Sequence, residues 1–388
     1  MNKNQLKILI ICAVACVCIA VLAVGIIVTQ ESGIEPSIQS TTPSTQATTP
    51  STEVTQPSTE AAQPSTEATQ PSTEATEPTQ EPTEPVTQYM NPLSGEILDA
   101  PYTSRPVAVV INNIKSALPH HGVKTAKILC EIVAEGGVTR CLAVYDDISK
   151  AGAIGSIRSG RTYLLSLAMN FDAIFVSAGT SVFFQEMNQE VNWPHLDGLR
   201  HHYFYRNQDR LNQGYAREHT MFTSGEGMVL AIEKYKMNGT SENLSYGWKF
   251  SDAPNQGTQT ANQITVHFYK NGKATNLTYN ADTKLYTAVQ HNQSYIDGND
   301  GTDMTFRNVL MIFAKTEKIP GCTNVRAELT GTGTGYFAVD GKVVPICWSR
   351  ESDSDPFTYT LEDGTPVVFG VGTTYMAVMP TGSNVKFG

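Results

Sequence analysis

The chain has 388 residues, of which 40% are hydrophobic and 16% charged, and its formal net charge is −10. Most of the negative charge lies in residues 29–88, which contain nine Glu and no Lys or Arg. The part that follows is close to neutral, so neither a basic surface for nucleic acid nor a strongly acidic surface is expected, and no nucleic-acid partner is predicted.

Residues 8–28 form a run of 21 uncharged, almost wholly apolar positions, preceded by Lys3 and Lys7. This length can span a bilayer core as a helix, and the lysines favour a cytoplasmic N-terminus. Residues 1–28 are therefore predicted to be a single-pass transmembrane anchor in the cell membrane, with the bulk of the chain extracytoplasmic.

Two alternatives to this anchor stay open. One is a cleaved signal peptide, whose apolar region is normally about 7–15 residues long. The other is a lipoprotein, because residues 13–16 loosely resemble a lipobox ending at Cys16.

Residues 29–88 are rich in Thr, Pro, Ser, Gln, Glu and Ala, and a seven-residue unit of the type PSTEATQ occurs four times. Seven-residue spacing is also typical of coiled coils, but a proline in every unit removes helix hydrogen bonding. The segment is predicted to be an extended, disordered, low-complexity stalk. Its many hydroxyl groups are plausible glycosylation sites.

Residues 89–240 are predicted to form an α/β domain, which begins with a strand at 107–111. A hairpin is expected next. With Glu135 and Gly136 as a two-residue loop, Glu131 would face Arg140 as a cross-strand ion pair.

Four cysteines lie beyond the apolar segment, namely Cys130, Cys141, Cys322 and Cys347. An even number in an exported domain permits two disulfides, and the local pairs would be Cys130–Cys141 and Cys322–Cys347. No Cys/His spacing typical of a zinc site occurs, so no metal and no cofactor are predicted.

Residues 140–179 are predicted to form a βαβ unit with a strand at 142–145, a helix at 162–171 and a second strand at 173–176. In such a unit the loop before the helix lies at the carboxyl end of the first strand, where α/β sheets usually hold ligands. Arg158 and Arg161 fall at this helix entry, where free backbone N–H groups already carry partial positive charge. Two cations there require a negative partner, which is either an internal carboxylate or a bound anion.

Two more helices are expected at 181–190 and 224–237, the second with Ser224 as a possible N-cap. The irregular stretch between them, residues 191–223, is rich in aromatic residues, arginine and histidine, as functional loops often are. Residues 241–388 contain short alternating runs between turn signals, which predicts a smaller β-rich domain. The predicted fold is thus an α/β N-terminal domain with a mixed sheet, followed by a β-rich C-terminal domain.

Several segments resemble the YerB-like family of bacterial exported lipoproteins, a family of unknown function. They are RPVAVVINN from Arg105, EIVAEGGVTRCLAVYDD from Glu131, IGSIRSGRTYLLSLAMNFDAIFVSAGTS from Ile154, HTMFTS from His219 and GTTYMAVMP from Gly372. The resemblance implies an α/β domain and a smaller β-rich one on the outer face of a Gram-positive membrane. It implies no particular reaction.

The predicted ligand-binding residues are Arg140, Arg158, Arg161, Ser156 and Glu135. Guanidinium groups at a helix N-terminus can hold a phosphate or carboxylate through paired hydrogen bonds. The alternative is an internal salt-bridge network of the arginines with Glu131, Glu135 or Asp172.

Glu131, Asp172 and His219 are the candidates for handling protons in a reaction. Their spacing matches no specific catalytic motif, so structural pairing of the carboxylates and a hydrogen-bonded loop histidine are the alternatives.

Two functions of the protein remain open. One is a non-enzymatic envelope protein that binds an anionic ligand or cell-wall polymer through an arginine-rich pocket. The other is an envelope hydrolase or transferase acting on a phosphate-linked or glycan substrate. The absence of a nucleophile motif favours the first.

Overall fold

The computed structural model describes residues 88–388 except for 242–243, 255–256 and 270–271. The predicted anchor at 1–28 and the predicted stalk at 29–88, apart from its last residue, lie outside the described residues. In the described ranges no helix combines the length and the apolar character needed to cross a bilayer.

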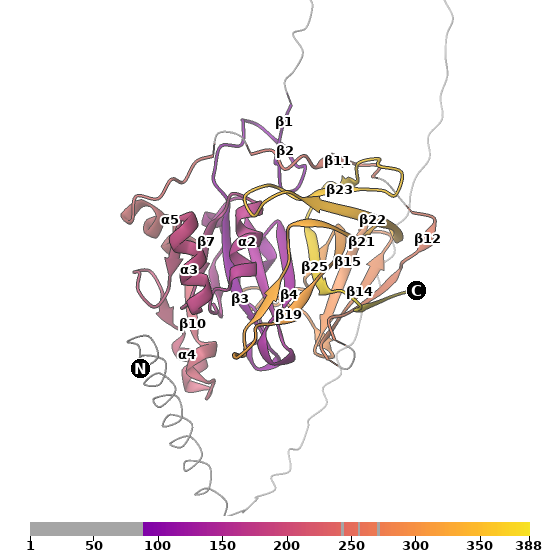
Figure 1. Ribbon diagram of the computed structural model, residues 1–388. Helices are drawn as coiled ribbons and strands as arrows, with labels where there is room; N and C mark the ends of the chain where they lie inside the picture. Colours follow the sequence, from indigo (N-terminus) through magenta and orange to yellow (C-terminus); the bar gives the residue numbers. More distant parts are fainter. Residues whose placement is uncertain (1–87, 242–243, 255–256, 270–271) are drawn as a thin grey trace, which may run out of the picture. The chain divides into compact units, whose positions relative to one another are not determined.

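Most of the regular secondary structure in the described chain is β-strand (Figure 1). The large sheet has eleven strands in the order β12 (Gln259–Thr260), β22 (Lys342–Arg350), β21 (Gly331–Val339), β18 (Asn308–Ala314), β25 (Thr374–Pro380), β4 (Ile128–Val133), β5 (Thr139–Tyr145), β3 (Val107–Asn113), β7 (Ile174–Ser177) and β8 (His195–Asp197), with β23 (Thr358–Thr360) beside β22. The second sheet has six strands in the order β16 (Gln293–Ser294), β15 (Leu285–Gln290), β14 (Ala274–Asn280), β13 (Gln263–His267) and β26 (Asn384–Phe387), with β17 (Thr305–Phe306) beside β15.

The remaining strands form smaller units. One sheet contains β6 (Ala153–Gly155), β10 (Met221–Ser224) and β9 (Tyr205–Arg206), and the pairs are β1 (Tyr89–Met90) with β2 (Ile97–Leu98), β11 (Lys249–Ser251) with β24 (Val368–Gly370), and β19 (Thr316–Lys318) with β20 (Val325–Ala327). The α-helices are α2 (Thr162–Asn170), α3 (Val182–Val191), α4 (Gln208–Asn212) and α5 (Gly225–Lys234). Short 3-10 helices are η1 (Lys115–Ala117), η2 (Val123–Thr125), η3 (Glu135–Gly137), η4 (Ile148–Lys150) and η5 (Arg217–His219).

The predicted fold, an α/β domain followed by a smaller β-rich domain, is wrong. Helices are few and short, and strands from both halves of the sequence belong to one sheet. The reason is β25, which comes from the end of the chain and lies between β18 and β4, parallel to both. Figure 1 shows this yellow strand beside strands of earlier colours. The domain boundary at 240/241 stays a prediction, and the large sheet runs across it.

The predicted βαβ unit is also wrong. Strand β5 is antiparallel to β3, and β7 is parallel to β3, so the strands before and after α2 run in opposite directions with β3 between them. A parallel unit does occur one step later, where α3 connects β7 to its parallel neighbour β8. The helices themselves are close to their predicted positions, and the N-cap at Ser224 is confirmed because its hydroxyl accepts a 3.0 Å hydrogen bond from the N–H of Gly227.

The β4–β5 hairpin differs from its predicted register by one residue. Its loop contains Glu135, Gly136 and Gly137, and both glycines have positive φ angles, 73° and 75°. Glu131 is therefore opposite Cys141, and Arg140 is opposite Ile132. Because side chains alternate along a strand, this shift places Glu131 and Arg140 on opposite faces of the sheet. The predicted Glu131–Arg140 ion pair is wrong for this reason.

All four described cysteines are free thiols, so neither local disulfide is present in the structure. Cys130 is opposite Leu142 and not Cys141, which puts the two thiols on different faces of the hairpin. Burial raises the pKa of the Cys130 thiol and that of Cys141, whereas Cys347 is exposed.

Alkylation of the native chain with iodoacetamide is expected to label Cys347 first among these cysteines. Cys130 and Cys141 should react only after unfolding, because the attacking thiolate is suppressed by burial. Peptide mapping by mass spectrometry at increasing urea concentrations measures this order. Equal labelling of Cys130 and Cys347 in native buffer would contradict it.

Candidate functional site

The arginine cluster, defined as Arg140, Arg158 and Arg161 together with Glu135, lies where β5 begins and α2 begins. Arg161 is the N-cap residue of α2, whose first turn has no side-chain cap. The loop that carries Arg158 is fixed by its backbone: the N–H of Arg158 donates to Val110 O on β3, and its carbonyl accepts from the N–H of Ala178 after β7, each at 2.9 Å. The loop therefore lies against the carboxyl ends of β3 and β7.

Glu135 pairs with two of the three arginines. Arg161 Nε donates to its Oε1 at 2.5 Å, and Arg140 Nη2 lies 3.1 Å from its Oε2. Burial alone would raise the pKa of Glu135, but the hydrogen bond from Arg161 and the charges of Arg140 and Arg161 outweigh it and lower the pKa. Glu135 is thus a carboxylate, and it supplies the internal salt bridge that the sequence left open as the alternative for Arg140 and Arg161.

Arg158 makes no ion pair or side-chain hydrogen bond with any residue in the described ranges. The pKa values of Arg140 and His219 are both lowered, mainly by burial. The charge of Arg158 lowers each of them further. Arg158 therefore lies close to both. The cluster holds three positive charges against one negative charge, and this excess lies at the N-terminus of α2, where the helix dipole adds to it.

Two buried hydroxyl groups near the cluster are without hydrogen-bond partners among the described residues. Tyr163, in the first turn of α2, is 2% exposed, and it interacts electrostatically with Arg140, Glu135 and Arg161. Burial raises the pKa of this phenol, so it is a neutral donor. Ser156, in the same loop as Arg158, is completely buried and also unpaired. Polar atoms in such positions normally find a partner, so both hydroxyls have unused capacity.

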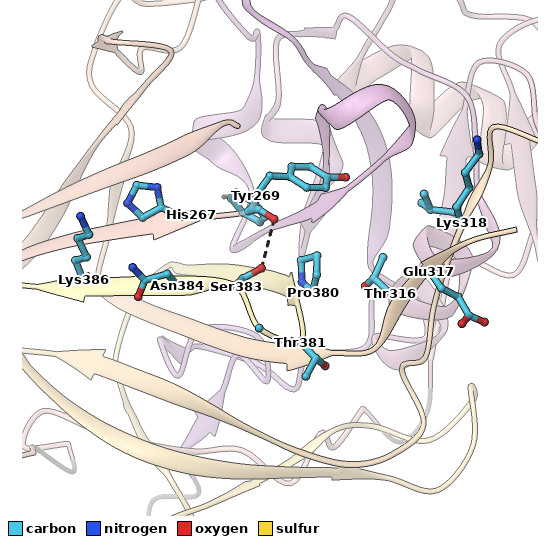
Figure 2. A pocket seen from close by; sticks show the side chains of 13 residues that line it. His267, Tyr269, Thr316, Glu317, Lys318, Pro380, Thr381, Ser383, Asn384 and Lys386 are labelled. Atoms are coloured by element: carbon cyan, nitrogen blue, oxygen red, sulfur yellow. Dashed lines mark hydrogen bonds between the residues drawn. The ribbon is translucent and has the colours of Figure 1, made fainter. Parts of the chain in front are cut away.

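A cavity of about 670 Å³ lies between the second sheet, the β19–β20 pair and the β25–β26 turn (Figure 2). Tyr269 connects it to the arginine cluster, because its hydroxyl donates a 3.2 Å hydrogen bond to Ala134 O, next to Glu135. Figure 2 shows Lys318 and Lys386 at opposite ends of the cavity, and both are exposed. In the described part of the chain neither ammonium group pairs with a carboxylate, although Glu317 also lines the cavity.

Glu131 is not part of the cluster. It is 1% exposed and lies between the two larger sheets, where it forms a buried ion pair with Lys273. Its carboxylate also accepts hydrogen bonds from the side chains of Asn113, Thr139, Thr275 and Tyr375. A carboxylate with all these partners has no capacity left for a substrate.

The other two proton-handling candidates are also separate. Asp172 follows α2 at the end remote from Arg161, and its Oδ1 accepts from Arg105 Nη2 at 2.6 Å. His219 lies at the end of η5, and its Nδ1 is 2.8 Å from Asn112 Nδ2. The structure does not bring Glu131, Asp172 and His219 together. Within the described ranges no three His, Cys, Asp or Glu side chains converge as metal ligands.

Family models match two consecutive parts of the chain. Residues 93–238 match the model described as "Protein of unknown function (DUF3048) N-terminal domain", and residues 264–376 match the corresponding C-terminal domain. The chain belongs to the DUF3048 family. A curated relative from Bacillus subtilis (strain 168), "Putative lipoprotein YerB", is 26% identical over 296 residues, which cover 74% of this chain and 86% of the relative. The YerB-like resemblance of the sequence is thereby confirmed.

A solved protein structure has the same fold. The crystal structure of YerB protein from Bacillus subtilis matches with a TM-score of 0.67 and 23% identity, and the match covers 76% of this chain and 99% of that chain. The likeness supports the arrangement of strands described above. It assigns no ligand, so the chemistry of the site rests on the residues of this chain.

Proposed function

We propose that this DUF3048 protein is an extracytoplasmic cell-envelope protein that binds an anionic ligand or wall component at the arginine cluster. Its location is supported by the lipoprotein description of its Bacillus subtilis relative and by the apolar run at residues 8–28, which attaches the chain to the membrane. Residues 29–88, in this proposal, carry the binding part away from the membrane surface.

One observation carries the binding proposal: Arg158 is a cation without a protein partner in the described ranges, next to two arginines that already share one carboxylate. A guanidinium group in this position favours a planar oxyanion, which it can hold with two parallel hydrogen bonds. The Tyr163 hydroxyl, which is buried beside Arg140 and Arg161, adds an unpaired dipole to the cluster. A phosphate, pyrophosphate or carboxylate group fits this set of donors.

An enzymatic function receives less support from the geometry. Glu131 is occupied by Lys273 and four further side chains, and Asp172 is paired with Arg105. A general base needs to lie within hydrogen-bond reach of a bound substrate, and neither carboxylate lies beside the arginine cluster.

Replacing Arg158 with glutamine tests the proposal. The full chain, mixed with inorganic pyrophosphate, phosphate or soluble wall-polymer fragments, is expected to unfold at a higher temperature, because a ligand that binds only the folded state stabilises it. Arg158→Gln is expected to weaken binding by about ten- to a hundredfold, since a hydrogen bond to a charged group contributes about 1.5–3 kcal/mol. Calorimetric titration measures the affinity.

Arg200→Gln is the matched control, because the Arg200 side chain is 71% exposed and is not a member of the cluster. This variant should bind as the original chain does. The proposal is wrong if none of the anions raises the melting temperature, or if the two variants lose affinity equally.

A further inference from the structure

A second cavity, of about 390 Å³, opens near the carboxyl end of β3. Its walls come from η1, from the chain that follows α4 and from η5, so most of it is built by the irregular stretch at 191–223. The side chains that matter for binding are Lys115, Leu118, Gln213, Tyr215 and His219. None of the three arginines of the arginine cluster lines it.

His219 presents a fixed donor to this cavity. The side chain is 7% exposed, and its Nδ1 lies 2.8 Å from the Nδ2 of Asn112. An amide nitrogen can only donate, so Nδ1 accepts and the ring proton of the neutral imidazole is on Nε2. The described residues supply no acceptor for this Nε2–H. His219 lines the cavity and its Nε2 is not among the fully buried polar atoms, so the Nε2–H group is open to a ligand atom or to water on that side.

The surroundings of His219 favour a negative ligand. Burial lowers the pKa of His219, and the charges of Arg158 and Arg210 lower it further, against an opposing effect of Glu218. Lys115 is exposed and, within the described ranges, pairs with no carboxylate. Arg210 is held by the carbonyl groups of Ala117, Pro119 and His219. The local charge is therefore positive even though the imidazole is neutral.

The opposite wall of the cavity is apolar and held in place. The ring of Tyr215 lies 5.1 Å from the guanidinium carbon of Arg210, and its hydroxyl donates to Leu118 O at 3.4 Å. Leu118 is 7% exposed. A volume of this size is typical of sites for small organic molecules, in which apolar walls enclose most of the ligand and a few polar groups orient it.

We propose that this cavity is a second binding site, which takes a small molecule with an oxyanion head and an apolar body. The oxyanion accepts hydrogen bonds from His219 Nε2–H and from the Lys115 ammonium group, and the body packs against Leu118 and Tyr215. Arg158 lies close to His219 but does not line this cavity, so substitutions of Lys115, and not of Arg158, test this site alone.

Three matched probes on the full chain test the proposal: benzoate, phenyl phosphate and the neutral benzamide. The long-range ¹⁵N–¹H spectrum of histidine-labelled protein should show the Nε2–H form of His219, and both anions should shift that signal. Benzamide should not. A larger response to one anion distinguishes a carboxylate from a phosphate ligand. No response to either anion would overturn the proposal.

Variants locate the binding. Lys115→Met changes an exposed residue and should fold normally, and it is expected to weaken benzoate binding about fivefold, as loss of a solvent-exposed charge pair would. Lys249→Met, at another exposed lysine, is the control and should bind normally. His219→Gln can keep an N–H near the Nε2 position, whereas His219→Leu cannot. Retained binding in Lys115→Met and in a folded His219→Leu would also overturn the proposal.

Discussion

A chain that ends at Gly372, and so lacks β25 and β26, is expected to have no cooperative unfolding transition. Strand β25 forms the centre of the large sheet, and without it β18 and β4 each lose a full row of backbone hydrogen bonds. Its four large side chains are at most 1% exposed, namely Tyr375, Met376, Val378 and Met379. At about 2 kcal/mol each, their burial is comparable with the whole stability of a typical domain.

A chain that ends at Pro380 is the control for this truncation. It keeps β25 and loses only β26, an edge strand whose partner is β13. We expect it to fold with reduced stability. Urea titrations followed by circular dichroism compare the three chains. A sharp transition in the chain that ends at Gly372 would show that β25 is not needed to join the halves.

Replacing Lys273 with methionine is expected to destabilise the protein by about 3–5 kcal/mol, the usual result of leaving a buried charge without its partner. Lys273 and Glu131 have side chains that are 4% and 2% exposed, so water cannot replace the lost contact. The double variant Glu131→Gln/Lys273→Met should recover most of the loss, because the amide keeps hydrogen bonds to Thr139, Thr275 and Tyr375 and carries no charge.

The pH dependence of the unfolding free energy, compared between the original chain and Lys273→Met, provides a second test. Burial acts to raise the pKa of Glu131, but the charge and hydrogen bond of Lys273 and the hydroxyl donors lower it below its ordinary value of 4.5. A lowered folded-state pKa adds stability that is complete above the unfolded pKa and is lost as the pH falls through the folded pKa. Without Lys273 the effect of burial raises the folded-state pKa of Glu131, so this carboxylate takes up a proton at a higher pH in Lys273→Met than in the original chain. The difference in unfolding free energy between the original chain and Lys273→Met should therefore narrow as the pH falls toward 4.5 and continue to narrow below it. A difference in unfolding free energy between these two chains that stays constant down to pH 3 would contradict this explanation.

Local sequence signals predict the local structure well. The helix at Thr162–Asn170 follows from its apolar spacing, and Ser181 and Ser224 mark the starts of α3 and α5 through hydroxyls that accept backbone hydrogen bonds. The hairpin at β4–β5 was placed correctly, but two successive glycines with positive φ made its loop one residue longer than the Glu135–Gly136 turn. Because of that one residue, Glu131 and Arg140 lie on opposite faces of the sheet and not on the same face.

Long-range pairing was not predictable in the same way. Strand β25 has the sequence TYMAVMP, in which Met and Ala are weak indicators of a strand, and its two neighbours are far away in the sequence. Burial on both faces also removes the alternation that identifies half-buried strands. Without β25 the two halves of the sequence resemble separate domains.

The candidate site was predictable in part. The sequence shows the excess of arginine at the start of α2 and therefore the need for a negative partner. In the structure that partner is Glu135, which pairs with Arg140 and Arg161. The contribution of Tyr163 depends on the packing of the helix, and that of Tyr269 depends on a contact between distant strands. No motif marks either tyrosine.

The position of β25 has a consequence for the order in which the molecule can form. Residues 374–380 leave the ribosome after both of their neighbours in the sheet, β4 and β18, and the middle of the large sheet cannot assemble before they arrive. Contacts that join distant parts of a chain also form slowly, because long loops must close first. A growing chain of this protein therefore stays without its central core until β25 has been synthesised. During that delay β4 and β18 each present an unpaired edge at the place that β25 will fill.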